Sequence, residues 1–131
     1  MALYNATILD HYQNPRNVGA LEAADAVGIV ENPACGDVLQ LYLQMQGGRI
    51  ALATFKTFGC APAIAASSLL TEMIRGATLE QIQQIKKEDI AEAMGGLPPM
   101  KLHCAVLAAD ALQAVAKDHR ARMGMSKLKT G

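Results

Sequence analysis

The stretch Leu39-Gln40-Leu41-Tyr42-Leu43-Gln44-Met45-Gln46-Gly47-Gly48 decides the fold of this chain. Its leucines and its methionine recur at every second position, and glutamines fill most of the positions between them. This period of two is the pattern of a half-buried β-strand. The glycine pair predicts a tight hairpin turn into a second strand over residues 49–58. Residues 27–31 can supply a third strand, so we expect a small antiparallel sheet.

The rest of the chain carries helix signals. Before the sheet, helical spacing of apolar residues from Leu3 to Tyr12 predicts a helix that ends at Asn14-Pro15, and residues 17–26 are predicted to form a loop. We expect His11 and His119 to be exposed helix residues without a role. Capping residues, glycine stops and apolar stripes predict four more helices: residues 62–75, a short helix opened by the capping box at 78–81, residues 88–95, and about 102–122.

These elements place the chain in the α+β class, with a three-stranded antiparallel sheet packed with about five helices. Its 131 residues fit one domain spanning 1–131, and we expect a flexible tail from about 124 to 131. Hydrophobic residues make up 51% and charged residues 18%, which excludes a disordered chain. The formal net charge is zero and tryptophan is absent, so neither a nucleic-acid partner nor an anionic membrane is expected.

The chain shows no targeting or membrane signal. The first residues lack a basic segment followed by an apolar run, and the most apolar tract, 61–70, is too short to cross a bilayer. We therefore expect a cytoplasmic protein. In that compartment three cysteines do not indicate a disulfide framework.

Each cysteine lies close to a second feature that suits metal binding. Cys35 precedes Asp37 by two positions, and Cys104 directly follows His103. Cys60 lies where a predicted strand gives way to a predicted helix. If the fold brings these five residues together, three thiolates, one imidazole and one carboxylate form a ligand set that suits zinc or an iron–sulfur cluster.

The positions of the cysteines strengthen this interpretation. Cys60 and Cys104 both lie at predicted helix N-termini, where unpaired N–H groups and the helix dipole favour thiolate over thiol. The spacing alone is a weak signal, because no two cysteines form a C-x-x-C pair. A single cysteine can also be a small buried apolar residue, Asp37 a turn residue and His103 a capping residue.

The segment Leu97-Pro98-Pro99-Met100-Lys101 has two interpretations. It can be a rigid connector between two helices, or an extended peptide that a partner protein recognises. From the residues alone the connector is favoured.

Four blocks of the sequence, taken in order, resemble the IscU family of iron–sulfur cluster scaffolds, which is similar to the N-terminal domain of NifU. The resemblance extends over nearly the whole chain and keeps all three cysteines in register. The blocks are Ile8 to Gly19, Asn32 to Asp37, Phe55 to Ser68 and Leu97 to Cys104.

The resemblance implies an α+β fold that gathers Cys35, Cys60 and Cys104 at one exposed end, with Asp37 and His103 nearby. It implies a carrier rather than an enzyme, which takes up ferrous iron and persulfide sulfur and builds a transient [2Fe–2S] cluster for transfer to apo-proteins. Cys104 would be the first sulfur acceptor, Cys35 and Cys60 further ligands, and Asp37 the ligand that keeps the cluster labile.

The resemblance also implies partners. These are a cysteine desulfurase as sulfur donor, an ATP-driven chaperone with a J-type co-chaperone, and a frataxin-like protein and a ferredoxin as further candidates. The chaperone would grasp Leu97-Pro98-Pro99-Met100-Lys101, which reverses the connector interpretation.

The sequence departs from the family pattern at two places beside the cysteines. Ala61-Pro62 follows Cys60 in place of glycine and a small residue, and Ala105 follows Cys104 in place of serine. Two alternatives to the scaffold stay open: a zinc-bound sulfur acceptor that stimulates a desulfurase, and a purely structural zinc domain. The chain lacks the insertion before the last motif that marks the zinc-dependent SufU branch, which favours the scaffold.

Overall fold

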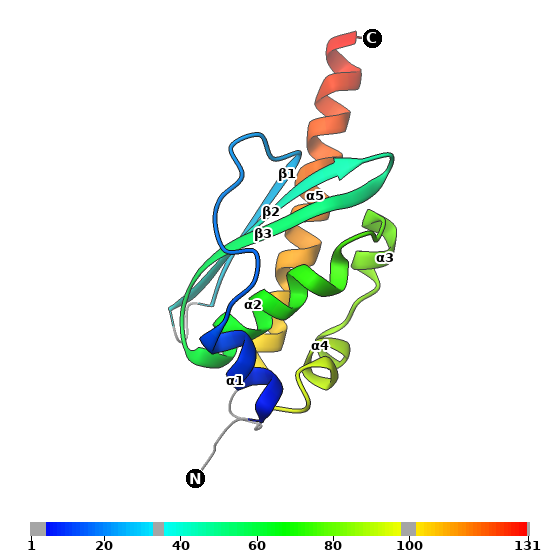
Figure 1. The fold of residues 1–131 in the computed structure, drawn as a ribbon. Coiled ribbons are helices and arrows are strands. Elements are labelled where there is room, and N and C mark those ends of the chain that lie inside the picture. The colour runs from blue at the N-terminus through cyan, green and yellow to red at the C-terminus, as the bar shows by residue number, and fades with distance from the viewer. Residues whose placement is uncertain (1–4, 33–35, 98–101, 131) are drawn as a thin grey trace.

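The structure is a computed structural model that describes residues 5–32, 36–97 and 102–130. Within these ranges the chain forms three strands and five helices in the order α1, β1, β2, β3, α2, α3, α4, α5 (Figure 1). The α+β class with a three-stranded antiparallel sheet is confirmed.

The first strand of the predicted hairpin is the centre of the sheet. β2 (Asp37–Gln46) pairs with β1 (Ala26–Asn32) on one side and with β3 (Arg49–Phe58) on the other. Gly47 and Gly48 form the turn with φ of 62° and 79°, a conformation that favours glycine. The alternating residues Leu39, Leu41 and Leu43 are buried, so the core lies on the predicted face of β2.

Two helices cover the apolar face of this sheet. α2 (Ala61–Ile74) packs on β3, and α5 (Leu102–Thr130) crosses β1 and β2 (Figure 1). Gly28 of β1 permits a close crossing, because a Cβ atom there would lie 2.7 Å from the backbone nitrogen of Val115 in α5. This contact fixes the height of α5 above the sheet.

The remaining helices complete the core around α2 and α5. α1 (Ala6–Gln13) packs on α2, and α3 (Leu79–Gln83) and α4 (Lys87–Ala93) pack on α5. The predicted capping box is present: Thr78 Oγ1 accepts from the Gln81 N–H, and the Gln81 side chain accepts from the Thr78 N–H. None of the described helices is long and apolar enough to cross a membrane.

α5 is longer than the sequence predicted. Its expected end was about residue 122, whereas the helix runs to Thr130 and projects beyond the sheet (Figure 1). A single Gly124 costs about 1 kcal/mol relative to alanine, and the Met, Leu and Lys residues around and after it are good helix formers.

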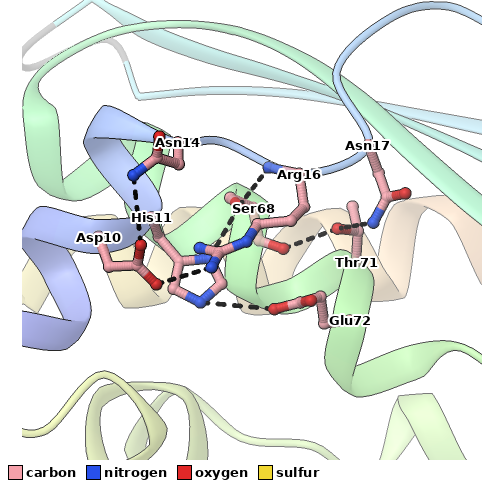
Figure 2. Close-up of polar contacts among 8 residues, drawn as sticks. All are labelled: Asp10, His11, Asn14, Arg16, Asn17, Ser68, Thr71 and Glu72. Carbon is pink, nitrogen blue, oxygen red and sulfur yellow. Dashed lines mark hydrogen bonds and ion pairs between the residues drawn. The ribbon is translucent and has the colours of Figure 1, made fainter.

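The expected exposure of His11 is wrong. Its side chain is buried between α1 and α2, and its Nδ1 lies 2.8 Å from Ser68 Oγ (Figure 2). The Ser68 oxygen also accepts from the backbone N–H of Arg16 at 2.9 Å, which ties the segment after α1 to α2. Ile8 and His11 are three residues apart, so both lie on the face of α1 that packs against α2. His119 is partly exposed.

Candidate metal centre

Three elements place potential metal ligands at one end of the molecule. Asp37 is the first residue of β2, Cys60 is the N-cap of α2, and His103 and Cys104 lie in the first turn of α5. The start of one strand and the N-termini of two helices therefore meet here. One potential ligand atom of each residue lies within 4.8 Å of the others.

Three of the distances between the donor atoms match those around one metal ion. The Sγ atoms of Cys60 and Cys104 are 3.5 Å apart. Asp37 Oδ2 lies 3.7 Å from Cys60 Sγ and 3.6 Å from His103 Nε2. Ligand atoms about 2.0–2.3 Å from a tetrahedral ion are about 3.3–3.8 Å apart, so these three separations match such a site.

The centre is partly closed to water. Cys104 is 1% exposed and Asp37 is 5% exposed, whereas Cys60 and His103 are half-buried. A buried carboxylate needs polar partners. The Cys60 thiol donates to Asp37 Oδ2, and Nε2 of His103 lies beside the same oxygen. The chemistry of the four donors suits zinc or an iron–sulfur cluster, as expected from the residues.

Gly59 leaves room for the carboxylate of Asp37. A Cβ atom at position 59 would lie 2.8 Å from both Cγ and Oδ1 of Asp37 and 3.2 Å from the Cβ of Ala63. The φ of Gly59 is not positive, so the backbone conformation does not require glycine. The residue is small because the carboxylate occupies the space that a side chain would take.

Two groups of predicted residues lie outside the described ranges. One is Cys35, within residues 33–35. The described residues on either side, Asn32 and Gly36, are joined by a hydrogen bond from the Gly36 N–H to the Asn32 carbonyl at 2.7 Å. The other is Pro98 to Lys101 of the proposed peptide. Leu97, which precedes them, packs partly buried against the hydrophobic core.

The two departures from the family pattern have different surroundings. Pro62 lies in the first turn of α2, where an N–H group has no partner within the helix, so the proline removes no helical hydrogen bond. Ala105 is 1% exposed and belongs to the hydrophobic core. A hydroxyl group at this position would need a hydrogen-bond partner among apolar side chains.

Sequence reasoning missed two apolar residues that flank the centre. Phe58 precedes the Gly59-Cys60 corner and is 63% exposed, and Leu102 precedes His103 and is 43% exposed. Their exposure depends on where β3 ends and α5 begins, and no periodic pattern in the sequence reveals it.

A comparison with family models matches residues 3–126 to the NifU-like N-terminal domain. Among curated proteins, the iron–sulfur cluster assembly scaffold protein IscU of Azotobacter vinelandii is 48% identical over 126 residues, covering 93% of this chain and 98% of the relative. The scaffold protein IscU 1 of Archaeoglobus fulgidus is 49% identical over 122 residues, covering 93% of this chain and 80% of the relative. A relative from Drosophila melanogaster, 45% identical and covering 93% of this chain and 81% of its own length, is named an iron–sulfur cluster assembly enzyme.

Solved structures share the fold. The N-terminal NifU-like protein of Brucella abortus superposes with a TM-score of 0.71 at 23% identity, covering 90% of this chain and 92% of the other. A protein of Fervidobacterium islandicum described as a putative iron–sulfur cluster assembly scaffold for the SUF system gives a TM-score of 0.69 at 22% identity, covering 87% of this chain and 96% of the other. At these identities the likeness shows the fold.

Proposed function

The chain belongs to the NifU-like N-terminal domain family, and we propose that it is a scaffold on which a labile [2Fe–2S] cluster is assembled before transfer to apo-proteins. The observation that carries this proposal is the group of Asp37, Cys60, His103 and Cys104, whose donor atoms lie within 4.8 Å of one another. Relatives that are nearly half identical over nearly the whole chain are named scaffolds for iron–sulfur cluster assembly.

In this proposal each residue has a role that follows from the chemistry of its donor atom. Thiolates hold iron firmly, so Cys35, Cys60 and Cys104 are the main ligands, and Cys104 is the first acceptor of persulfide sulfur. The Asp37 carboxylate is a harder ligand and binds cluster iron more weakly, which makes the cargo easy to release. His103 supplies the further donor of the group. The protein is a carrier that is loaded with a cluster and then releases it, not a catalyst of a chemical reaction on a substrate.

The proposed partners follow from the materials that a cluster requires. A cysteine desulfurase supplies sulfur, ferrous iron is the second substrate, and apo-proteins receive the product. A frataxin-like protein and a ferredoxin are further candidates. The exposed Phe58 and Leu102 support a protein contact at this end, because exposed apolar side chains beside a functional site favour docking. We place this exchange in the cytoplasm, where thiols stay reduced.

A chaperone contact is proposed for Leu97-Pro98-Pro99-Met100-Lys101. An ATP-driven chaperone and its J-type co-chaperone would bind this segment, which directly precedes α5 and its second and third residues, His103 and Cys104. Its position in the sequence supports the proposal, because a partner bound to this segment would lie beside His103 and Cys104, two of the four metal donors.

A zinc-bound sulfur acceptor is the second candidate function. Three donor separations, of 3.5–3.7 Å, favour it, because they match the spacing of ligands around one tetrahedral ion. In this alternative, tightly bound zinc is required for the stimulation of a desulfurase, and no cluster forms.

Anaerobic reconstitution separates the two candidates. Purified protein is incubated with ferrous iron, cysteine and a desulfurase, and visible absorption is followed before and after apo-ferredoxin is added. The scaffold yields a [2Fe–2S] spectrum that moves to the ferredoxin and is lost in Cys35→Ser, Cys60→Ser and Cys104→Ser. His119→Gln, far from the centre along α5, serves as the matched control and behaves as the wild type. Zinc retention with a persulfide and no cluster would overturn the scaffold.

A further inference from the structure

The two edges of the sheet differ in how far they are covered. On the outer side of β3, the Phe55 N–H donates to the Asn17 carbonyl, and the Phe55 carbonyl accepts from the Gly19 N–H. Nearer the start of the strand, the Ile50 N–H donates to the Ala77 carbonyl. These bonds close the β3 edge, so β1 is the edge at which a further strand can pair.

The pairing register shows which backbone groups of β1 face outwards. Phe55 directs its N–H and carbonyl away from β2. Leu41 of β2 lies opposite both Phe55 and Gly28, so Leu41 exchanges its hydrogen bonds with Gly28. Backbone groups alternate in direction along a strand, so the groups of Gly28 face β2 and those of its neighbours face outwards. The residues of β1 with outward groups are therefore Val27, Ile29 and Glu31.

Side chains of α5 occupy only the start of this edge. Asp118 Oδ2 accepts from the Val27 N–H at 2.8 Å and from Arg122 Nε at 2.9 Å. Arg122 also donates to the Ala24 carbonyl at 3.0 Å. Since Ala24 lies beside Arg122 and Val27 beside Asp118, β1 and α5 run in opposite directions. In the described part of the chain, no hydrogen bond reaches the outward groups from the Val27 carbonyl to the Glu31 N–H.

A groove of about 350 Å³ follows the open part of the edge between β1 and α5. Ile29, which is 61% exposed, lines the groove from the strand. Ala114, Lys117 and Ala121 line it from the helix, and their spacing of three and four residues places them on one face of α5. The small side chains of the two alanines leave room beside the strand for another chain.

The two ends of this edge carry opposite charges. Lys117 lies with Val27 at one end of the groove. Asp110 and Glu31 lie together at the other end, where both line a second hollow. The three charged side chains are exposed, and none of the ion pairs between described residues includes them. A two-fold axis through Ile29 exchanges the two ends, so the acidic end of one copy meets the basic end of another.

We propose that the open edge of β1 pairs with the same edge of a second copy of this chain, antiparallel and centred on Ile29. Two three-stranded sheets then join into one sheet of six strands. Ile29 exchanges two backbone hydrogen bonds with Ile29 of the second copy, and the Glu31 N–H of each copy donates to the Val27 carbonyl of the other. The exposed Ile29 side chains become a cross-strand pair.

The positions of the helices agree with the same axis. Ala114 lines the groove together with Ile29, so the two α5 helices approach each other at small side chains. Lys117 of each copy then lies beside Glu31 and Asp110 of the other. Antiparallel pairing directs the two metal centres to opposite ends of the joined sheet, so neither covers the other. The contact is small, and we expect a weak, reversible dimer.

Reciprocal charge reversals test the pairing. Analytical ultracentrifugation of the full chain measures the dissociation constant over a range of concentrations, with a thiol reductant to exclude disulfide-linked dimers. Glu31→Lys and Lys117→Glu each place like charges at both ends of the contact, and each should weaken the dimer about tenfold or more. An equimolar mixture of the two variants restores both attractive pairs and should dimerise as the wild type does. Lys87→Glu, an exposed charge reversal on α4, is the control and should also dimerise as the wild type does.

Amide hydrogen exchange identifies the surface that pairs. When the protein concentration is raised, the amides of Ile29 and Glu31 should exchange more slowly. The Val27 amide already donates to Asp118 and should not change. Far-UV circular dichroism shows that the charge variants are folded.

Several results would overturn the self-pairing. One is a wild type that stays monomeric at every concentration, and another is a mixture of the two charge variants that does not dimerise. Concentration-dependent protection away from β1 would assign a dimer to a different surface. Protection of Ile29 that appears only when a different protein is added would assign the edge to that protein.

Discussion

A single missing side chain sets the geometry of the centre. Gly59 leaves the Asp37 carboxylate room at the end of β3, and the carboxylate in turn faces Cys60 and His103. Any Cβ at position 59 lies too close to the carboxylate, and the Cβ of Ala63 limits movement on the side of α2. A larger residue here should therefore change the centre by displacing the Asp37 carboxylate.

We expect Gly59→Ala to weaken zinc binding by about tenfold, which corresponds to about 1.4 kcal/mol. The methyl group displaces the carboxylate from its place beside the other donors. Competition with a chromophoric chelator measures the affinity of the wild type, Gly59→Ala, Asp37→Ala and the double variant. In the Asp37→Ala background the alanine at 59 should have almost no further effect. An equal loss in both backgrounds would show that Gly59 acts on the backbone instead.

Asp37→Ala should hold a preformed cluster longer and donate it more slowly. The carboxylate is the weaker ligand for cluster iron, so its removal takes away the donor that exchanges most readily. Cluster transfer to apo-ferredoxin is followed by circular dichroism after the variant and the wild type are loaded to the same extent. An unchanged transfer rate would contradict this role for Asp37.

Part of the centre could be predicted from the sequence at this scale. Asp37, Cys60, His103 and Cys104 were predicted because thiol, imidazole and carboxylate groups beside helix starts carry their chemistry in their residue types. The contact between Gly59 and Asp37 could not be predicted, because it joins two strand ends whose separation depends on the finished sheet. Cys35 lies outside the described residues, and its part in the centre stays a prediction.

At the scale of helices and strands, the polar contact between α1 and α2 links stability to pH. His11 lies between Ser68 and Glu72 of α2, and the charged groups that face it are Glu72, Arg16 and Asp10 (Figure 2). Burial, with the nearby Arg16 guanidinium, lowers the pKa of His11 from its ordinary value of 6.5. Asp10 stays ionised near neutral pH, because the hydrogen bond from Arg16 lowers its pKa as well.

The sign of the pH effect follows from this direction. Unfolded His11 binds a proton below about pH 6.5, whereas the folded protein resists protonation, so the unfolded state binds more protons in that window. The contribution of neutral, buried His11 to the free energy of unfolding is complete above pH 6.5 and decreases as the pH falls below that value. Urea unfolding of metal-free protein between pH 8 and pH 5 measures the loss. His11→Gln should flatten the decrease, whereas the control His119→Gln should retain it. A decrease of equal size in both variants would assign the effect to other groups.

The crossing of α5 over β1 gives a second prediction for these elements. Gly28→Ala places a methyl group 2.7 Å from the Val115 backbone nitrogen and 3.0 Å from the Ala111 carbonyl oxygen, so strand and helix must separate. We expect a loss of about 1–3 kcal/mol in the free energy of unfolding, measured in urea. Ile29→Ala, at the neighbouring residue that is 61% exposed, should change it by less than about 0.5 kcal/mol. A Gly28→Ala protein as stable as the Ile29→Ala control would contradict the close packing.

Local signals explain which elements could be predicted. The glycine turn after β2, the capping box at Thr78 and the helix stop at Gly76 each depend on a few adjacent residues, and all three are present. The burial of His11 depends on the packing of α1 against α2, which no local signal specifies. The continuation of α5 to Thr130 was missed because the basic residues that favour a helix end are also good helix formers.

At the scale of the whole molecule, the core and the metal centre are separable. The buried cluster of apolar side chains runs from the sheet to α2, α4 and α5, and its members lie on every described helix and strand. We expect a core of this extent to fold without a metal ion, in contrast to small zinc domains that unfold when the metal is removed.

Chelation should therefore leave a folded protein of lower stability. Metal-free protein is expected to keep its far-UV circular dichroism and to unfold cooperatively. Zinc at 100 times its dissociation constant adds about 2.7 kcal/mol, which raises the melting temperature by about 10 °C. Cys60→Ser and Cys104→Ser should lose most of this increase. Complete unfolding of the wild type on chelation would instead indicate a structural zinc domain.

The position of His103 and Cys104 in the first turn of α5 has a mechanical consequence. These two donors follow Lys101 by two and three residues, whereas Asp37 and Cys60 belong to other elements. A tensile force applied just before α5 would unwind its first turn and withdraw two donors together, while the sheet and the far end of the helix stay folded. The cargo could then leave through a movement of one turn, and the cost would be a few helical hydrogen bonds and not the stability of the domain.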